Sequence, residues 1–247
     1  MTSLILDKIA IPAESPRISR RRLIEKLNCS LANCNLTIIN GRAGTGKTLL
    51  TTDFAWQCGH PVAWYKVDAS DSDPAVFFRY LMAGIVQQRP GFGSGWKDEW
   101  LENDMLRLAE SFAHELDQAA SPLVIVLDDL HLVYDAEWIA PFLSRFWPLL
   151  PVEAHLVIIG RIPPPTPLWR MRSKQTLCLI DETALSFSLL ETAMLLESYG
   201  LPQSVAFEVL RESCGRASRV GAIIREMLVA DRSANLPHQG MPQEVFS

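Results

Sequence analysis

Short apolar runs and longer stripes of apolar residues at helical spacing alternate along the chain. Runs of five to eight mostly apolar residues predict buried strands. These runs are 35–40 (NLTIIN), 61–68 (PVAWYKVD), 122–129 (PLVIVLDD), 154–161 (AHLVIIGR) and 176–180 (TLCLI). Apolar residues at helical spacing predict helices over 21–31, 47–59, 73–88, 99–120, 135–150 (with interruptions near Pro141 and Pro148), 189–200, 202–215 and 216–231. The alternation predicts an α/β protein whose parallel sheet is covered by helices on both faces.

The last part of the chain contains no apolar run of the strand type. We therefore expect a domain over residues 1–185, a helical subdomain over 186–232, and a linker or tail over 233–247. Residues 1–17, with Pro12 and Pro16, are expected to form an irregular arm, and residues 89–98 a mobile glycine-rich loop.

The segment GRAGTGKT, from Gly41 to Thr48, stands between a predicted strand and a predicted helix. In that context it predicts a P-loop, in which Gly41 and Gly46 allow backbone conformations closed to other residues. Backbone N–H groups and the helix N-terminus then form an anion cradle. Lys47 adds a positive charge on the β- and γ-phosphates, and the Thr48 hydroxyl is a ligand for Mg²⁺. The residues expected to bind the cofactor, ATP or ADP, are Gly41, Arg42, Ala43, Gly44, Thr45, Gly46, Lys47, Thr48 and Leu49.

Two adjacent aspartates end the apolar run LVIVLDD. P-loop proteins that transfer phosphoryl groups need a carboxylate near the metal. We expect Asp128 to hold Mg²⁺ and Asp129 to orient the attacking water. Arg161 follows another buried run, so it is expected at the crevice where it can contact the γ-phosphate. Lys47, Asp129 and Arg161 are thus the expected catalytic residues, and His131 is interpreted as structural.

Composition and charge exclude several other functions. The net charge of −5 gives no global reason to bind nucleic acid, and the basic cluster 17–26 is interpreted as a solvated face or a helix start. An odd number of cysteines, five, without a CxxC pair indicates a reduced protein with buried thiols. No signal peptide and no apolar run of about 20 residues are present, so we expect a cytoplasmic protein without membrane contact.

The chain resembles the nucleotide-binding module of the MalT-type, LuxR-family ATP-dependent transcriptional regulators, a branch of the STAND NTPases. The resemblance covers most of residues 17–230. It rests on the segments RRLIEKL, NGRAGTGKTLL, AWYKVDASDSDPAVFFRYL, LVIVLDDLHLV, LPVEAHLVIIGRIPPPTPLWRMRSKQTL and LSFSLLETAMLL. It implies a three-layer P-loop fold with strand order 5-1-4-3-2, followed by a small helical subdomain. It also implies that ADP holds a resting form, and that ATP with an inducer favours a self-associating form.

Two features depart from the family pattern. The family has a glycine–tryptophan pair in the third helical segment, where this chain has Gly215 followed by Arg216. The family also continues into a winged helix, a helical-repeat domain that binds the inducer, and a DNA-binding domain. We expect the present sequence to be an excised N-terminal part, with a naturally short relative as the alternative. The partners of an excised part would be those further domains, and we expect no DNA contact from this region.

The resulting hypothesis is a regulatory switch that binds ATP or ADP and slowly hydrolyses ATP with Mg²⁺. Two alternatives stay open. A small-molecule P-loop kinase would need a second substrate pocket and a basic lid, and the loop 89–100 carries little positive charge. An interaction module that binds ADP without turnover is disfavoured by the two aspartates.

Overall fold

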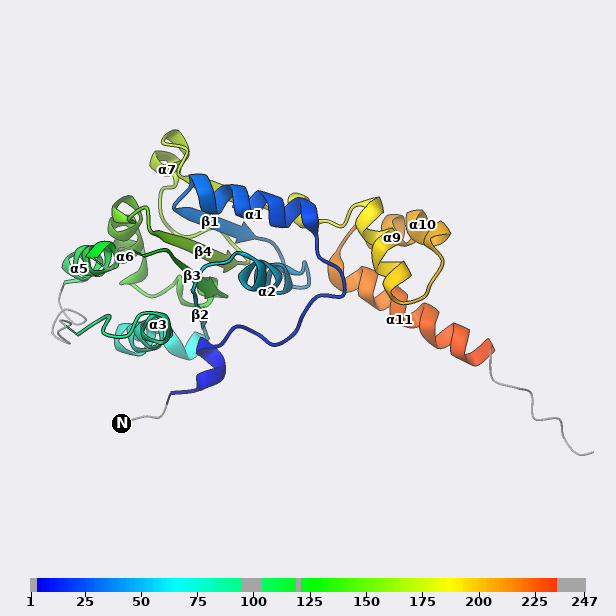
Figure 1. The fold of residues 1–247 in the computed structure, drawn as a ribbon, viewed down its shortest axis with the longest axis horizontal. Coiled ribbons are helices and arrows are strands. Elements are labelled where there is room, and N and C mark those ends of the chain that lie inside the picture. Colours follow the sequence, from blue (N-terminus) through cyan, green and yellow to red (C-terminus); the bar gives the residue numbers. More distant parts are fainter. Residues whose placement is uncertain (1–3, 95–103, 119–120, 235–247) are drawn as a thin grey trace, which may run out of the picture. The chain divides into compact units, whose positions relative to one another are not determined.

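A computed structural model gives the fold and describes residues 4–94, 104–118 and 121–234. Its contacts divide the chain into two units, Met1–Leu185 and Ser186–Ser247 (Figure 1). Each unit is presented by itself. Most of the predicted linker or tail, residues 235–247, and parts of the predicted loop and helix around 95–103 and 119–120 lie outside the described residues.

The first unit is built on a sheet of five parallel strands in the order β2-β3-β4-β1-β5. The strands are β1 (Leu36–Asn40), β2 (Val62–Lys66), β3 (Leu123–Asp128), β4 (Ala154–Gly160) and β5 (Leu177–Ile180). The order is that implied by the family resemblance, read from the opposite edge. The central strands β3 and β4 are buried along their whole length, as expected for a sheet covered on both faces.

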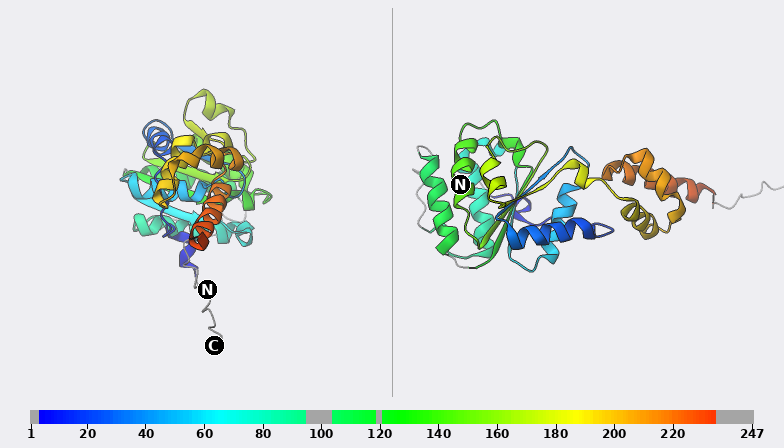
Figure 2. Two further views of the ribbon diagram at one scale, coloured as in Figure 1. Left: turned by 90° about the vertical axis from the view of Figure 1, so that its right-hand side faces the viewer. Right: turned by 90° about the horizontal axis from the view of Figure 1, so that it is seen from above.

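Helices cover both faces of this sheet (Figure 2). They are α1 (Arg21–Asn33), α2 (Lys47–Gln57), α3 (Pro74–Gln88), α5 (Met105–Gln118), α6 (Ile139–Phe146), α7 (Trp169–Ser173) and α8 (Glu182–Leu185). Alternate residues of β3 belong to different cores, because successive side chains of a strand point to opposite faces. Leu123, Ile125 and Leu127 pack with α3, α5 and α6, whereas Val124 and Val126 pack with α1 and α2.

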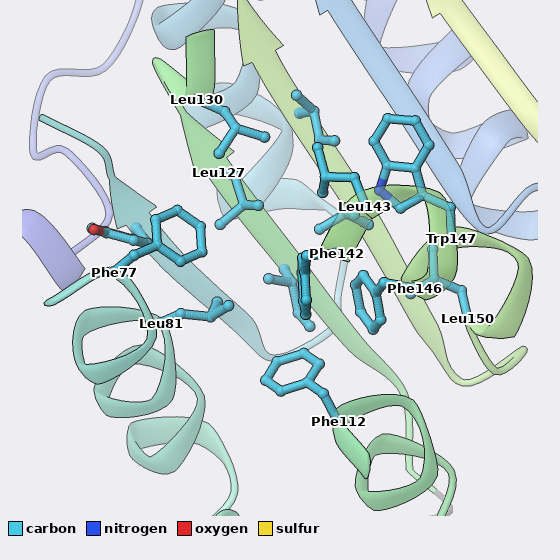
Figure 3. Close-up of a cluster of buried hydrophobic side chains, with 14 of the residues drawn as sticks. Phe77, Leu81, Phe112, Leu127, Leu130, Phe142, Leu143, Phe146, Trp147 and Leu150 are labelled. Atoms are coloured by element: carbon cyan, nitrogen blue, oxygen red, sulfur yellow. The ribbon is translucent and has the colours of Figure 1, made fainter. Parts of the chain in front are cut away.

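The larger core is rich in aromatic rings (Figure 3). Phe112 of α5 meets Phe146 of α6 at a ring-centroid distance of 5.2 Å, edge to face. Phe142 stacks on Phe146 at the same distance, and Phe78 of α3 meets Phe142 at 4.8 Å. Such aromatic pairs contribute about 0.5–1.5 kcal/mol each beyond their burial. They hold α3, α5 and α6 as one layer on this face.

A chain of buried polar groups crosses the opposite side of the sheet. The carbonyl of Cys34 accepts from Nδ1–H of His155 (2.8 Å), which assigns the tautomer. Nε2 of His155 then accepts from the Thr37 hydroxyl (2.9 Å), and Thr37 accepts from the Ser30 hydroxyl (2.7 Å). Burial lowers the pKa of His155 to about 4. The ring is therefore neutral at physiological pH and joins α1, β1 and β4.

Two predicted elements differ from the structure. The arm 1–17 contains a 3-10 helix, Leu6–Ile9, anchored by burial of Ile9 and by an ion pair from Lys8 to the buried Asp71 (2.7 Å). The helix expected over 135–150 begins only at Ile139. Pro141 does not interrupt it, because Pro141 lies in the first turn, where its missing N–H has no intrahelical partner to lose. A 3-10 turn, Trp147–Leu149, accommodates Pro148.

The basic cluster 17–26 is not simply a solvated face. Arg20, which is buried, donates to the carbonyl of Leu185 (2.9 Å). Arg22 donates to Ala184 (3.0 Å), and Lys26 donates to Leu179 (2.9 Å). These cations bind the carbonyl groups of β5 and α8 and so hold α1 against the edge of the sheet.

The prediction of buried thiols is wrong. All five cysteines are free, Cys29 and Cys214 are exposed, and Cys34, Cys58 and Cys178 are half-buried. The reason is their position: Cys34, Cys58 and Cys214 are C-cap residues of helices. Cys178 lies on the edge strand β5.

The second unit contains three main helices, α9 (Leu189–Ser198), α10 (Ala206–Ser213) and α11 (Ala217–Ala234). Their buried contacts come from Leu196, Ala206, Val209, Val220 and Ile224. Ser188 and Glu191 form a reciprocal capping box at the start of α9. α11 extends to Ala234, into the segment expected to be a tail.

Gly215, which matches the glycine of the family's glycine–tryptophan pair, has a structural reason to be glycine. Its φ is +70°, and a Cβ would lie 3.0 Å from the carbonyl oxygen of Phe187. The carbonyl of Gly215 accepts from the N–H of Phe187 (2.8 Å). The turn before α11 is therefore packed directly against the chain that enters α9.

Candidate phosphate-binding site

The predicted site residues come together at the carboxyl edge of the sheet. Asn40, the last residue of β1, pairs with Gly160, the last residue of β4, and Lys66 of β2 pairs with Asp128 of β3. These strands therefore end at one edge, and the loop 41–46 leads from β1 into α2, which begins at Lys47. In open α/β sheets this edge is where ligands bind.

Glycines shape the loop in two different ways. Gly44 and Gly46 have φ values of +78° and +83°, which side chains disfavour. Gly41 does not adopt such a conformation, so its predicted role is corrected. A Cβ at Gly41 would lie 3.0 Å from Oγ1 of Thr45 and 3.1 Å from Cδ1 of Leu185. Gly41 is needed for close packing, and Gly44 supplies the left-handed turn.

Lys47 is nearly buried and is held by the loop itself. Its Nζ donates to the carbonyl oxygens of Gly41 (2.6 Å) and Arg42 (3.0 Å). Burial lowers the pKa of Lys47, and the negative charges of Asp129 and Asp128 oppose that change. The ammonium group is thus fixed in position by two carbonyl groups at the base of the loop, beside two carboxylates.

A pocket of about 280 Å³ opens above this loop. It is lined by Ala43, Gly44, Gly46, Lys47, Thr48, Leu49, Asp129 and Arg161. The structure therefore brings together eight of the twelve predicted site residues around one cavity. The other four, Gly41, Arg42, Thr45 and Asp128, lie next to the pocket without lining it.

Arg42 is turned away from the cavity towards Glu182, the first residue of α8. The backbone N–H of Arg42 donates to Oε2 of Glu182 (3.1 Å), and its Nε donates to Oε1 (2.7 Å). Because this N–H bonds a carboxylate, it does not point at the cavity. Sequence reasoning missed Glu182. Its only signal was a carboxylate two positions after a buried run, at the carboxyl edge of the sheet.

Asp128 lies behind Thr48 and is completely buried. The Thr48 hydroxyl lies 3.1 and 3.2 Å from the two carboxylate oxygens of Asp128 and donates to them. Burial raises the pKa of Asp128 to about 6, and the charge of Asp129 adds to this rise. Asp128 is therefore not a solvated aspartate at the end of a strand.

Asp129 has a backbone conformation that is rare outside glycine. It follows β3 with φ +58° and ψ +29°, in the left-handed region. Its carboxylate lies on the pocket wall, and Nδ1 of His131 lies 3.8 Å from its Oδ1. Arg161 is exposed and lies on the same wall. The left-handed residue turns the chain sharply, so that Asp128 stays buried while Asp129 faces the cavity.

The described residues contain no group of three or more histidine, cysteine or acidic side chains arranged to hold a metal ion. Among the described helices, none combines the length and the apolar character needed to cross a bilayer.

Two solved structures show the same fold. The chain aligns with the Drosophila ORC bound to DNA at a TM-score of 0.54 and 16% identity, over 90% of this chain and 59% of that one. It aligns with a Walker-type ATPase of Pyrococcus abyssi at a TM-score of 0.50 and 13% identity, over 91% of this chain and 80% of that one. At these identities the similarity concerns the fold alone.

Curated relatives are transcriptional regulators. The HTH-type transcriptional regulator MalT of Serratia proteamaculans is 32% identical over 192 residues, and that of Yersinia enterocolitica is 31% identical over 189 residues. Each alignment covers 75% of this chain and 21% of the relative, so the chain spans about a fifth of the length of the relatives it matches. No family model matches the chain. The parallel sheet, the glycine loop with Lys47 and this similarity identify the chain as a P-loop NTPase module of the MalT type.

Proposed function

We propose that this module binds ATP and ADP in the pocket beside Lys47 and acts as a regulatory switch with slow, Mg²⁺-dependent ATP hydrolysis. In this proposal it forms the N-terminal part of a LuxR-family transcriptional regulator in the cytoplasm. One observation carries the proposal. A cavity of about 280 Å³ has a glycine loop and a fixed ammonium group on one side, and a carboxylate and a guanidinium group on the other.

The residues beside the loop fit a magnesium ion. The Thr48 hydroxyl donates its proton to Asp128, which leaves the oxygen lone pairs of Thr48 available as a ligand. Mg²⁺ prefers oxygen ligands and keeps several waters, with few protein ligands and the substrate phosphates completing its shell. Thr48 would bind the ion directly, and the buried Asp128 would hold it through Thr48 and water. The ion would supply positive charge to the β- and γ-phosphates.

Asp129 is placed to orient the attacking water. Asp129 lines the same pocket as the loop that would hold the phosphates. The water oxygen would bond to the γ-phosphorus while the bond from that phosphorus to the bridging oxygen breaks. ADP and inorganic phosphate are the products, and the proton of the water passes to Asp129 or to the phosphate.

A switch requires a group that interacts differently with ATP and ADP. Arg161 is that group in this proposal, because its guanidinium lies on the pocket wall and can form two bonds to γ-phosphate oxygens. The partners of the ATP form would be further domains of the same regulator and a second copy of the chain. The curated relatives, which are about five times as long as the aligned region, support such further domains.

Binding of nucleotide to protein stripped of nucleotide tests this proposal. A ligand that binds only the folded state stabilises it by about 2.7 kcal/mol at a hundredfold excess over its Kd. ADP and Mg-ATP should each raise the Tm by several degrees. Lys47→Ala should lower both affinities at least about tenfold in calorimetry, because a charge-assisted bond contributes about 1.5–3 kcal/mol.

The control variant is Lys174→Ala, which removes an exposed lysine at the end of α7, outside the pocket lining. It should bind both nucleotides as the parent does. Unchanged affinity in Lys47→Ala would contradict the phosphate site. Binding without phosphate release would leave an ADP-binding interaction module. Faster ADP formation with a small-molecule acceptor, without a matching release of inorganic phosphate, would indicate a kinase.

A further inference from the structure

Glu182 is a carboxylate beside the phosphate loop that the proposed hydrolysis does not use. Both of its oxygens contact Arg42, a residue of the loop itself. Oε2 accepts from the backbone N–H of Arg42 (3.1 Å), whereas Oε1 accepts from Nε (2.7 Å) and lies 2.6 Å from Nη2. An exposed ion pair contributes little on its own, but a guanidinium contact through two nitrogens, combined with a backbone N–H, has a fixed geometry. The contact therefore restrains the backbone of the loop as well as two side chains.

The carbonyl group of Arg42 has a different set of partners. It accepts from Nζ of Lys47 (3.0 Å) and from the Thr45 hydroxyl (2.9 Å). An ammonium group has three donors, and Lys47 gives two of them to the carbonyl groups of Gly41 and Arg42. Contact with both a β- and a γ-phosphate oxygen would need two donors, so the loop would lose one of its bonds to Lys47. Phosphate binding would therefore disturb the bonds at the base of the loop to which Arg42 belongs.

Charge acts in the same direction. Burial lowers the pKa of Lys47, and Glu182 is one of three carboxylates whose charges oppose that change, so it lies within electrostatic reach of this cation. Phosphates bound beside Lys47 would repel the Glu182 carboxylate and attract the Arg42 guanidinium. Both effects act against the contact between Arg42 and Glu182.

Glu182 is also the first residue of α8, which packs directly on the loop. A Cβ at Gly41 would lie 3.6 Å from Cα of Glu182 and 3.1 Å from Cδ1 of Leu185, so little space separates the two segments. Leu185 is the last residue of the first unit. Glu182 therefore lies within one helical turn, along the chain, of the boundary between the units.

We propose that the contact between Arg42 and Glu182 is a latch that lowers the affinity of the site for nucleotide, and that bound phosphates weaken this latch. The inference rests on the proposed nucleotide site, and it adds a pair of residues that sets the affinity of that site. By thermodynamic linkage, a ligand that weakens a contact binds more tightly once the contact has been removed. Removal of either partner should therefore raise the affinity, although the two side chains carry opposite charges.

Four variants test the latch. Glu182→Gln removes the negative charge, Arg42→Gln removes the guanidinium, and a third variant combines both changes. Arg42→Lys keeps the positive charge but cannot contact a carboxylate through two nitrogens. Calorimetry with Mg-ATP on protein stripped of nucleotide gives the affinity, and thermal melting reports the fold. The matched controls are Glu25→Gln and Arg172→Gln, which change exposed residues outside the pocket lining.

We expect Glu182→Gln, Arg42→Gln and Arg42→Lys each to raise the affinity for Mg-ATP about threefold or more. The double variant should match the single variants, because all of them remove the same contact. The controls should bind as the parent does. If Arg42→Gln fails to fold, Glu182→Gln and Arg42→Lys still decide the question.

A simple effect of charge through space gives a different pattern. In that case Glu182→Gln binds more tightly, Arg42→Gln binds more weakly, Arg42→Lys equals the parent, and the double variant returns to the parental affinity. This pattern would overturn the latch, as would weaker binding by Glu182→Gln.

The parent protein separates this inference from the proposed function. A parent that binds neither ATP nor ADP overturns the nucleotide site and the latch together. A parent that binds Mg-ATP with an affinity that the variants of Arg42 and Glu182 leave unchanged overturns the latch alone.

Discussion

Lys47 and Arg161 are the two cations on the pocket wall, and they are held very differently. Lys47 is buried and bonded to two carbonyl groups of the loop. Arg161 is exposed, and among the described residues it forms no hydrogen bond or ion pair of its own. A fixed cation suits the phosphates that ATP and ADP share. A cation on an unrestrained side chain is better placed to respond to a phosphate that only ATP carries.

Arg161→Ala should therefore discriminate between the nucleotides. We expect ATP affinity to fall about tenfold or more and ADP affinity to change little, because only ATP offers γ-oxygens to the guanidinium. Calorimetry with both nucleotides on one preparation measures this. Arg172→Ala, which removes an exposed arginine of α7 outside the pocket, is the matched control. Equal losses for ATP and ADP would make Arg161 a general phosphate ligand and require another sensor.

Asp129 illustrates how a single backbone conformation determines a site. Its left-handed φ and ψ carry a cost of about 1–3 kcal/mol for an ordinary residue, and such positions concentrate at functional sites. Asp and Asn tolerate the conformation better than Ala does. Asp129→Asn is therefore a cleaner substitution than Asp129→Ala, because it removes the charge without adding backbone strain.

Hydrogen bonds between buried polar groups connect strands and helices, and a pattern of apolar residues does not predict them. The chain from Ser30 through Thr37 and His155 to the carbonyl of Cys34 joins α1, β1 and β4 below the phosphate site. All its donors and acceptors depend on a neutral His155. Protonation of His155 would place a positive charge among buried groups. It would also put a proton on Nε2, the nitrogen that accepts from the Thr37 hydroxyl.

This network predicts a specific dependence of stability on pH. The pKa of His155 is about 4 in the folded protein, below the value of about 6.5 expected for the unfolded chain. The contribution of neutral His155 to the free energy of unfolding is complete above pH ~6.5. It is lost as the pH falls towards about 4, because the unfolded state binds the proton first. Of a total of about 3 kcal/mol, about 2 kcal/mol should be lost between pH ~7.5 and pH ~5.

Urea unfolding of the parent and of His155→Gln at these two pH values measures this contribution. The variant cannot titrate at this position, so its free energy of unfolding should fall about 2 kcal/mol less than that of the parent. The variant itself is expected to be less stable at neutral pH. An identical pH dependence in both proteins would show that His155 is not the group responsible.

Each of the two units has its own buried cluster. The two cores around the sheet use residues up to Leu185, and the third uses residues between Leu196 and Ile224. No buried cluster of the described residues draws on both units. A chain cut after Leu185 therefore keeps its large cores intact. The remaining 62 residues bury few large side chains, and small domains are marginally stable.

We expect residues 1–185, expressed alone, to unfold in one cooperative thermal transition followed by circular dichroism. Residues 186–247 alone should show little cooperative unfolding, because a unit of this size with so small a core is marginal. The uncut chain is the control for both. A first unit that is already unfolded at room temperature would contradict the separation of the cores. Retained ADP binding by residues 1–185 would in addition place the phosphate site within them.

Local signals in the sequence determined much of the secondary structure of this protein and the position of its glycine loop. The positions of the strands, the strand–loop–helix context of Gly41 to Thr48, and Asp73 as the N-cap of α3 are all readable from neighbouring residues. The reason is that these features depend on periodicity and on bonds within a few residues. The strand order also followed, through resemblance to a family and not through the pattern itself.

Only the tertiary structure decided which side chains meet. Glu182 binds Arg42 across 140 positions of sequence, and three of the five thiols lie at helix ends. Gly41 is needed for the approach of Leu185, a contact set by the return of the chain after β5. His131 faces Asp129 because one residue adopts a left-handed conformation. Such contacts depend on how the elements pack in the sheet and on single backbone dihedral angles. The spacing of apolar residues predicts neither of these.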